Sequence, residues 1–390
     1  MTAGVQAPRV ALLVNLVAPY RVALYDEIAR YVDLEVLFSG HEDNRVGWED
    51  AYLGLTRARA QRVAGWVLKR KRPAIDGPPR SDERADRRYL HISPGYCVDL
   101  ARYRPDAIVT SEMGWRTMVA LAYGLLTRVP VWVMIEVSLH SERHCGRLRS
   151  MARALILRLT RGWIAVGDCT AEYLASLKVP TSRVTTIQNT VDERPFRAVR
   201  RLPRTANQKP VALCVGQLVP RKGVGLLLEA LATLARRGIE VELLIAGDGP
   251  ERPWLEERAK QLHLTGVSFL GRRTTDELAG LFRRADFLVF PTLEDVWGLV
   301  VNEALWSGLP VLASRYAGCA KELLPAGNIF DPLDDRGFVD ALERAAVLGL
   351  APADEGPLWS TAMAARRLAE TVLGSLGPAA PDPLGQVTRS

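Results

Sequence analysis

Short apolar runs rich in β-branched residues alternate with longer stretches in which apolar positions recur at helical spacing. Continuous apolar strands separated by helices are typical of parallel sheets covered on both faces. The pattern occurs twice, and it predicts an α/β protein with two doubly wound domains. The predicted strands are 10–15, 34–38, 107–110, 131–135, 163–166 and 184–187 in the first half, and 211–215, 241–246, 267–270, 287–290, 311–313 and 328–330 in the second.

The stretch 192–209 is the best linker in the chain because it is rich in arginine and proline and has no apolar periodicity. We therefore predict an N-terminal domain over 1–195, a C-terminal domain over 205–375 and a flexible tail over 376–390. Ligands of doubly wound sheets bind outside the carboxyl ends of the strands, so we expect the strand-end loops of both domains to line one shared cleft.

The composition of the 390 residues is that of an ordinary globular protein, with 48% hydrophobic and 24% charged residues. No run approaches 18 consecutive apolar residues, and we interpret the apolar start 10–18 as a first buried strand and not as a leader. The five cysteines lie far apart and suggest a reducing, cytoplasmic environment. The pair His140 and His144 lacks the acid placement of a zinc motif.

The formal net charge of +7 is built almost entirely from arginine, and much of the excess lies between Arg57 and Arg88. Three interpretations are open: a solvated loop, a surface for anionic lipid, and a site for an acidic substrate. The apolar residues Trp66 and Leu68 beside the basic ones favour a peripheral membrane contact. Nucleic acid is not expected, because the basic residues are not interleaved with stacking aromatics.

The most informative stretch follows the predicted strand 287–290. A loop with an acid at Asp295 and a glycine at Gly298 leads into an amphipathic helix that begins near Leu299. The free N–H groups of the first helical turn, with the positive end of the helix dipole, favour an anion. Glu303, about one turn later, is suited to accept hydrogen bonds from two vicinal hydroxyls. A ligand with a phosphate at the helix start and two vicinal hydroxyls beside it is typically a nucleotide.

A second loop, after the strand 211–215, carries Gly216, two adjacent cations at Arg221 and Lys222, and Gly223 before a helix. Two anion sites in one domain suit a diphosphate better than a single phosphate. The glycine-rich turn 246–250 after the next strand is interpreted as an ordinary strand-to-helix turn.

These motifs together resemble glycosyltransferase family four, the retaining glycosyltransferases of the GT-B fold. Asp295 and Glu303 match its E-x7-E motif, and 216–223 is similar to its G-R-L-x-x-x-K-G loop. Further similar segments are 189–192, 246–249, 269–271 and 285–291. The resemblance is dense over 211–331 and thinner in the N-terminal half.

The resemblance implies that Glu303 binds the ribose, Asp295 the donor sugar and Lys222 the diphosphate. The remaining residues that it implies for the donor site are Gly216, Gln217, Gly271, Arg272, Trp297, Gly298, Leu299 and Val300. Two positions depart from the family pattern: Gln217 replaces an arginine, which leaves Arg221 as a substitute cation, and Asp295 replaces a glutamate.

Three polar residues of the N-terminal half are further candidates. Arg21 lies where the family often has a glycine-rich turn; it either reaches the donor phosphates or bonds within its own domain. Glu136 and His140 follow the predicted strand 131–135, a region in which the family places sugar-contacting residues.

The predicted reaction is transfer of a sugar from a nucleotide diphosphate sugar, UDP favoured over GDP, to a hydroxyl acceptor. Retention at the anomeric carbon is implied by the resemblance. No cofactor and no metal are expected, because the cations at 221–222 face the leaving group and no D-x-D pair follows a strand. The alternatives are an idle nucleotide-sugar-binding or membrane-adaptor protein and an epimerase or phosphorylase of the same fold.

Overall fold

The computed structural model describes residues 7–40, 42, 47–71, 87–142, 147–197, 209–351, 354 and 356–376. The chain divides into two compact units. Within the described residues, the first unit takes the chain up to Arg70, then Arg88–Asp192, and then the segment from Trp359 onward. The second unit contains Glu193–Leu358.

The described residues of the first unit form a seven-stranded sheet, and every pairing in it is parallel. The strand order is 3-2-1-6-7-8-9, so the order reverses between β1 and β6. In this order the strands are β3 (Arg59–Arg62), β2 (Asp33–Phe38), β1 (Arg9–Val14), β6 (Ala107–Ser111), β7 (Val131–Ile135), β8 (Gly162–Val166) and β9 (Val184–Ile187). A separate pair consists of β4 (Trp66–Lys71) and β5 (Arg87–Ile92).

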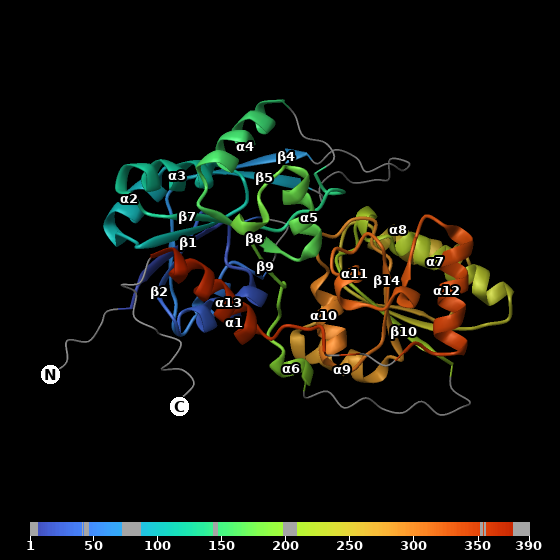
Figure 1. Ribbon diagram of the computed structural model, residues 1–390. Helices are drawn as coiled ribbons and strands as arrows, with labels where there is room; N and C mark the ends of the chain where they lie inside the picture. Colours follow the sequence, from blue (N-terminus) through green and yellow to red (C-terminus); the bar gives the residue numbers. More distant parts are fainter. Residues whose placement is uncertain are drawn as a thin grey trace. The chain divides into compact units, whose positions relative to one another are not determined.

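Alternate side chains of this sheet enter two cores. One core joins the sheet to α1 and α13, and the other joins it to α2, α3, α4 and α5 (Figure 1). The helices are α1 (Pro19–Ile28), α2 (Gly95–Tyr103), α3 (Trp115–Thr127), α4 (Arg147–Leu159), α5 (Asp168–Ser176) and α13 (Thr361–Leu373).

The second unit contains a six-stranded sheet within the described residues, again parallel throughout. Its order, 12-11-10-13-14-15, reverses between β10 and β13. The strands are β12 (Val267–Gly271), β11 (Glu242–Ala246), β10 (Val211–Val215), β13 (Phe287–Phe290), β14 (Val311–Ser314) and β15 (Ile329–Phe330). The helices are α6 (Arg194–Arg197), α7 (Val224–Arg236), α8 (Arg252–Gln261), α9 (Thr275–Arg284), α10 (Leu299–Trp306), α11 (Ala320–Leu323) and α12 (Asp335–Val347).

The twelve predicted strands are confirmed, with small shifts at their ends. Strands β3 and β4 lie in the basic stretch 57–88, and β5 begins at its end; the sequence had left this stretch open as a solvated loop, a surface for anionic lipid or a site for an acidic substrate. The sequence of β3, Arg-Ala-Gln-Arg, has no apolar run because this strand lies at the edge of the sheet. Residues 72–86 of the stretch lie outside the described residues.

The structure corrects the predicted domain boundary at 375. Helix α13 packs on the first unit, where Ala365, Leu368 and Val372 are buried against the sheet beside α1. The apolar stripe of this helix specifies a buried face but not the sheet that receives it. Residues 198–208 of the predicted linker 192–209 and residues 377–390 of the predicted tail 376–390 lie outside the described residues. In the part of the chain that the structure describes, none of the helices combines the length and hydrophobicity needed to traverse a bilayer.

Replacing Leu368 with alanine should destabilise the first unit by about 3 kcal/mol, because it leaves a cavity in a close-packed core. Hydrogen exchange read by mass spectrometry should show faster exchange in β1 and β2 and unchanged exchange in β10 and β11. Met363→Ala, on the exposed side of the same helix, is the matched control and should change stability by less than about 0.5 kcal/mol. Faster exchange confined to the second unit would contradict the placement of α13.

Candidate functional site

The two motif loops of the second unit follow β10 and β13, the neighbouring strands between which the strand order reverses. In doubly wound sheets, ligands bind at the carboxyl edge at such a switch point, where adjacent loops diverge to opposite faces. The loop after β10 is 216–223, and the loop after β13 is 291–298. Residues some seventy positions apart in sequence are thus brought to one place.

Arg221 joins the two loops through both its main chain and its side chain. Its carbonyl oxygen accepts hydrogen bonds from the N–H of Leu293 (2.7 Å) and the hydroxyl of Thr292 (3.0 Å). Its guanidinium Nη1 donates to the carbonyl of Glu294 at 3.2 Å. The predicted phosphate cation Arg221 therefore also holds the loop after β13 in place.

Lys222 and Asp295 form an ion pair between the same two loops, with Nζ donating to Oδ2. The two side chains are only 14% and 16% exposed. The Lys222 ammonium also lies 5.1 Å from the centre of the Phe290 ring, within cation–π range. Burial by itself would raise the pKa of Asp295, but the charges of Lys222 and Arg221 and the Trp297 N–H hold that pKa below its usual value. The structure thus brings together two predicted site residues as a cation and a carboxylate.

The loop after β13 ends at Gly298, which has a φ of +103° and directly precedes α10. A Cβ here would lie 2.7 Å from the Phe290 ring, so only glycine fits. The N–H of Trp297 donates to Asp295 Oδ1 at 3.2 Å, and its buried indole Nε1 donates to Asn302. Leu299 and Val300 occupy the first helical turn, where N–H groups have no intrahelical acceptor.

Glu303 lies one turn into α10 and is half-buried. Burial raises the pKa of its carboxyl group to about 8, with no other cause contributing. Hydroxyl groups of a ligand could donate hydrogen bonds to the Glu303 carboxylate. Such hydrogen bonds would replace the hydration lost on burial and would favour the ionised form.

Glycines allow the loops after β10, β11 and β12 to pack backbone against backbone. A Cβ on Gly247 would lie 1.8 Å from the carbonyl oxygen of Gly216, and one on Gly249 would lie 2.3 Å from that of Leu218. The Gly247 N–H donates to the carbonyl of Gly271 at 2.8 Å. The prediction that 246–250 forms a strand-to-helix turn is confirmed.

The other predicted donor residues lie at this edge of the sheet. Gln217 is half-buried beside Gly216. Gly271 is buried at the end of β12, and Arg272 follows it at the surface.

In the first unit, Arg21 and Glu136 pair with each other. Arg21 Nη2 donates to Glu136 Oε2 at 3.2 Å, and Asn189 Nδ2 donates to Glu136 Oε1 at 2.6 Å. The contact within its own unit, one of the two interpretations of Arg21, is therefore what the structure contains. His140 is half-buried in a turn where Ser138 and Ser141 exchange hydrogen bonds.

A polar network of Asn15, Glu112 and Arg116 lies at the switch point of the first unit. Arg116, at the start of α3, is buried and donates to Asn15 after β1 and to Glu112 after β6, the latter at 2.8 Å. Asn15 Nδ2 also donates to Glu112 at 3.1 Å. Glu112 has a φ of +66°, which is uncommon for a side chain with a Cβ. The reversal of strand order that marks this position is a property of the tertiary structure, and no sequence motif pointed to Arg116.

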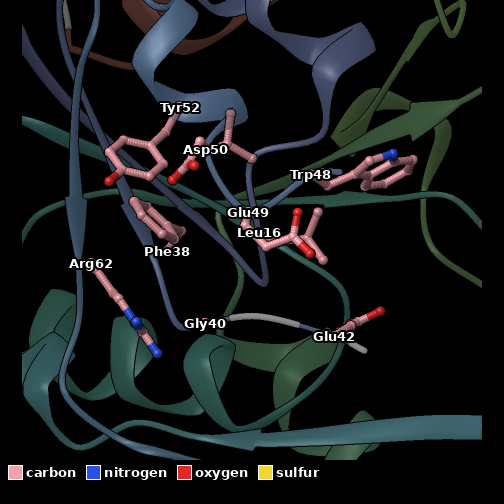
Figure 2. A pocket seen from close by; sticks show the side chains of 10 residues that line it. Leu16, Phe38, Gly40, Glu42, Trp48, Glu49, Asp50, Tyr52 and Arg62 are labelled. Atoms are coloured by element: carbon pink, nitrogen blue, oxygen red, sulfur yellow. The ribbon is translucent and has the colours of Figure 1, made fainter. Parts of the chain in front are cut away.

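A cavity of about 470 Å³ lies at the carboxyl ends of β1, β2 and β3, and no sequence motif pointed to it. In the view of Figure 2 the Trp48 ring lies on one side and Phe38 and Tyr52 on the other, with the Glu49 carboxylate between them. The residues that line it are Leu16, Val17, Phe38, Gly40, Glu42, Trp48, Glu49, Asp50, Tyr52 and Arg62.

One wall of this cavity is fixed by a buried histidine. His91 Nε2 lies 3.3 Å from Glu42 Oε1, and its Nδ1 lies 2.8 Å from the hydroxyl of Ser39. Aromatic faces and oriented carboxylates together suit a molecule that has C–H faces and hydroxyl groups. Among the described residues, no group of three His, Cys, Asp or Glu side chains is placed to hold a metal ion.

The family model described as "Glycosyl transferases group 1" matches residues 197–347. Curated relatives include sulfoquinovosyl transferase SQD2 of Arabidopsis thaliana, 28% identical over 65% of this chain and 52% of that protein. Another is the glycogen synthase of Mycobacterium tuberculosis, 29% identical over 62% of this chain and 60% of that protein. The chain thus spans a little over half the length of these relatives.

Solved structures with the same fold cover nearly the whole chain. The lipopolysaccharide outer core galactosyltransferase WaaB has a TM-score of 0.69 at 15% identity, covering 94% of this chain and 99% of WaaB. Anabaena HepE in complex with UDP and glucose has a TM-score of 0.64 at 17% identity, covering 97% and 100%. The fold is therefore the α/β GT-B fold predicted from the sequence.

Replacing Gly223 with alanine should destabilise the second unit by more than about 3 kcal/mol. Its φ is +68°, and a Cβ would lie 2.1 Å from the carbonyl oxygen of Pro291, in the other loop. The control is Gly238→Ala, at a φ of +82° with no atom near its Cβ, which should cost about 1 kcal/mol from backbone strain alone. Urea unfolding measures both, and equal losses would show that the two loops do not pack as described.

Proposed function

We propose that the protein transfers a sugar, with retention, from a nucleotide diphosphate sugar to a hydroxyl acceptor; the match of residues 197–347 to the family model described as glycosyl transferases group 1 supports this proposal. A UDP-sugar is favoured over a GDP-sugar. The observation that carries the proposal is the Lys222–Asp295 pair at the switch point of the second sheet, beside the first turn of α10 and Glu303.

Each part of this site has a task in the proposed reaction. The diphosphate accepts hydrogen bonds from Lys222 and from the N–H groups of Leu299 and Val300. Glu303 accepts the two ribose hydroxyls. Asp295, held ionised by Lys222, accepts a hydroxyl of the donor sugar. Gly271 and Arg272 lie at the end of β12, where their main chain contacts the base.

The bond between the anomeric carbon and the diphosphate oxygen breaks as the acceptor oxygen bonds to that carbon. The acceptor proton passes to the departing diphosphate, so no protein nucleophile is needed. Lys222 and the helix start stabilise the negative charge that develops on the leaving group. Their positive charge takes the place of a divalent metal, and we therefore propose a metal-independent reaction.

The acceptor is assigned to the first unit. The cavity lined by Trp48, Glu49, Asp50 and Tyr52 offers ring faces for stacking and carboxylates for hydroxyl groups. Glu136, fixed between Arg21 and Asn189, and His140 are assigned to contacts with a sugar.

The names of similar proteins support a nucleotide-sugar donor. HepE has been crystallised with UDP and with UDP-glucose. A Mycolicibacterium smegmatis relative, 33% identical over 43% of this chain, is named as a GDP-mannose-dependent mannosyltransferase. UDP-, GDP- and TDP-sugars should therefore be compared by thermal shift, since a bound donor raises the unfolding temperature.

The decisive experiment is product analysis with the donor that binds, with and without EDTA. Transfer to an added alcohol or sugar acceptor, unchanged by EDTA, is the expected outcome. Binding without transfer would establish the idle binding protein instead. Conversion of the donor to its epimer, or cleavage that requires inorganic phosphate, would establish an epimerase or a phosphorylase.

Binding of the donor should release a proton at pH 7, because of Glu303. Its carboxyl group has a raised pKa of about 8 and is mostly protonated in the free protein, whereas hydroxyl donors favour the carboxylate. Affinity should therefore increase from pH 6 to pH 8.5. Titration calorimetry in buffers of different ionisation enthalpy measures the release, and Glu303→Gln should abolish it and bind the donor at least about tenfold more weakly. Equal proton release by wild type and variant would rule out this role for Glu303.

Replacing Lys222 with methionine should lower kcat by about a hundredfold or more, because it removes the cation that faces the leaving group. Lys260→Met, at an exposed position of α8, is the matched control and should retain the wild-type rate. Circular dichroism shows whether the variant is folded. Wild-type kcat in folded Lys222→Met would contradict the assignment.

A further inference from the structure

Helices α3 and α4 are neighbours on the first unit (Figure 1), and each packs one face against the sheet. Val119 and Ala120 of α3 and Ile156 of α4 are buried in the core that covers the sheet. Arg153 of α4 is also buried; it pairs with Glu142 and donates to the Tyr173 hydroxyl at 2.9 Å. The orientation of both helices is therefore fixed.

The outer faces of these helices are unusually apolar. Leu126 is 87% exposed, Met151 71% and Leu125 63%. Met151, Leu155 and Leu159 are spaced four residues apart, so they form one stripe along α4. We call this surface the α3–α4 face; its large apolar side chains are Trp115, Leu125, Leu126, Met151, Leu155 and Leu159.

The charged residues within α3 and α4 and at their ends are all arginines. Arg128 at the end of α3 and Arg158 and Arg161 at the end of α4 are exposed. Neither 115–128 nor 147–161 contains an aspartate or a glutamate, although the whole chain has 44 acidic residues. An apolar stripe flanked by arginine is the pattern of a helix that lies in the plane of a membrane interface.

The arginines also decide between the partners that an apolar face can have. Two copies of the chain related by a twofold axis would bring the same arginines together, and like charges across an interface disfavour association. A bilayer with anionic headgroups instead receives the leucine and methionine side chains and offers phosphate groups to each guanidinium.

We propose that the α3–α4 face binds the surface of a bilayer that contains anionic phospholipid, with α3 and α4 in the interfacial plane. This site differs from the basic stretch 57–88, for which the sequence had left a membrane contact open. It does not depend on the proposed transferase reaction.

The test is vesicle flotation of the full chain at about 0.1 M salt, with phosphatidylcholine alone or mixed with phosphatidylglycerol. Wild type should bind mixed vesicles at least tenfold more than neutral ones. The double variant Leu126→Glu/Leu155→Glu should lose at least tenfold in binding, because both side chains are exposed and enter the interface. Leu333→Glu/Leu348→Glu, at exposed leucines of the second unit, is the matched control and should bind as wild type.

A second pair of substitutions tests the charge. Arg158→Gln/Arg161→Gln should weaken binding to mixed vesicles about thirtyfold and leave binding to neutral vesicles nearly unchanged. In the absence of vesicles, all variants should unfold at the same temperature as the wild type and bind the donor with the same affinity.

Three outcomes would overturn the proposal. The first is wild-type flotation by the Leu126→Glu/Leu155→Glu variant, and the second is no flotation of the wild type. The third is a wild-type dimer in light scattering that this variant converts to a monomer, since the face would then be a contact between copies.

Discussion

The ion pair between Lys222 and Asp295 connects the two loops on which the candidate donor site is built. Each partner is mostly buried, so removing one of them would leave the other charge uncompensated and would destabilise the folded protein. The pair also holds the pKa of Asp295 low, although burial opposes this. Its geometry follows from the strand order, because β10 and β13 are neighbours although far apart in sequence.

The backbone around this pair leaves no room for side chains at several positions. Gly223 is in close contact with Pro291 of the other loop, and Gly298 with the ring of Phe290. Arg221 adds hydrogen bonds to Thr292, Leu293 and Glu294. Residues that the sequence suggests as ligand contacts are therefore also structural, and substitutions here must be read for stability as well as for activity.

The strand order of the first unit also reverses at a switch point, but the side chains there differ from those of the second unit. Its switch point holds the Asn15–Glu112–Arg116 network, and the cavity beside β1–β3 is lined by aromatic and acidic side chains. Diphosphate binding is assigned to cations and helix amides in one unit, and acceptor binding to rings and carboxylates in the other. The α3–α4 face is a separate surface, on the side of the sheet covered by α2 to α5.

The sequence by itself determined the twelve apolar strands and the two motif loops, because continuous apolar runs and glycine spacing are local properties. It did not reveal the edge strand β3, which has no apolar run, or the sheet that receives α13, since an apolar stripe does not name its partner. Only the tertiary structure decided that Lys222 meets Asp295, that Arg21 meets Glu136, and that burial raises the pKa of Glu303. Those facts depend on which strands become neighbours and how much water is excluded, and both are set by contacts between distant parts of the chain.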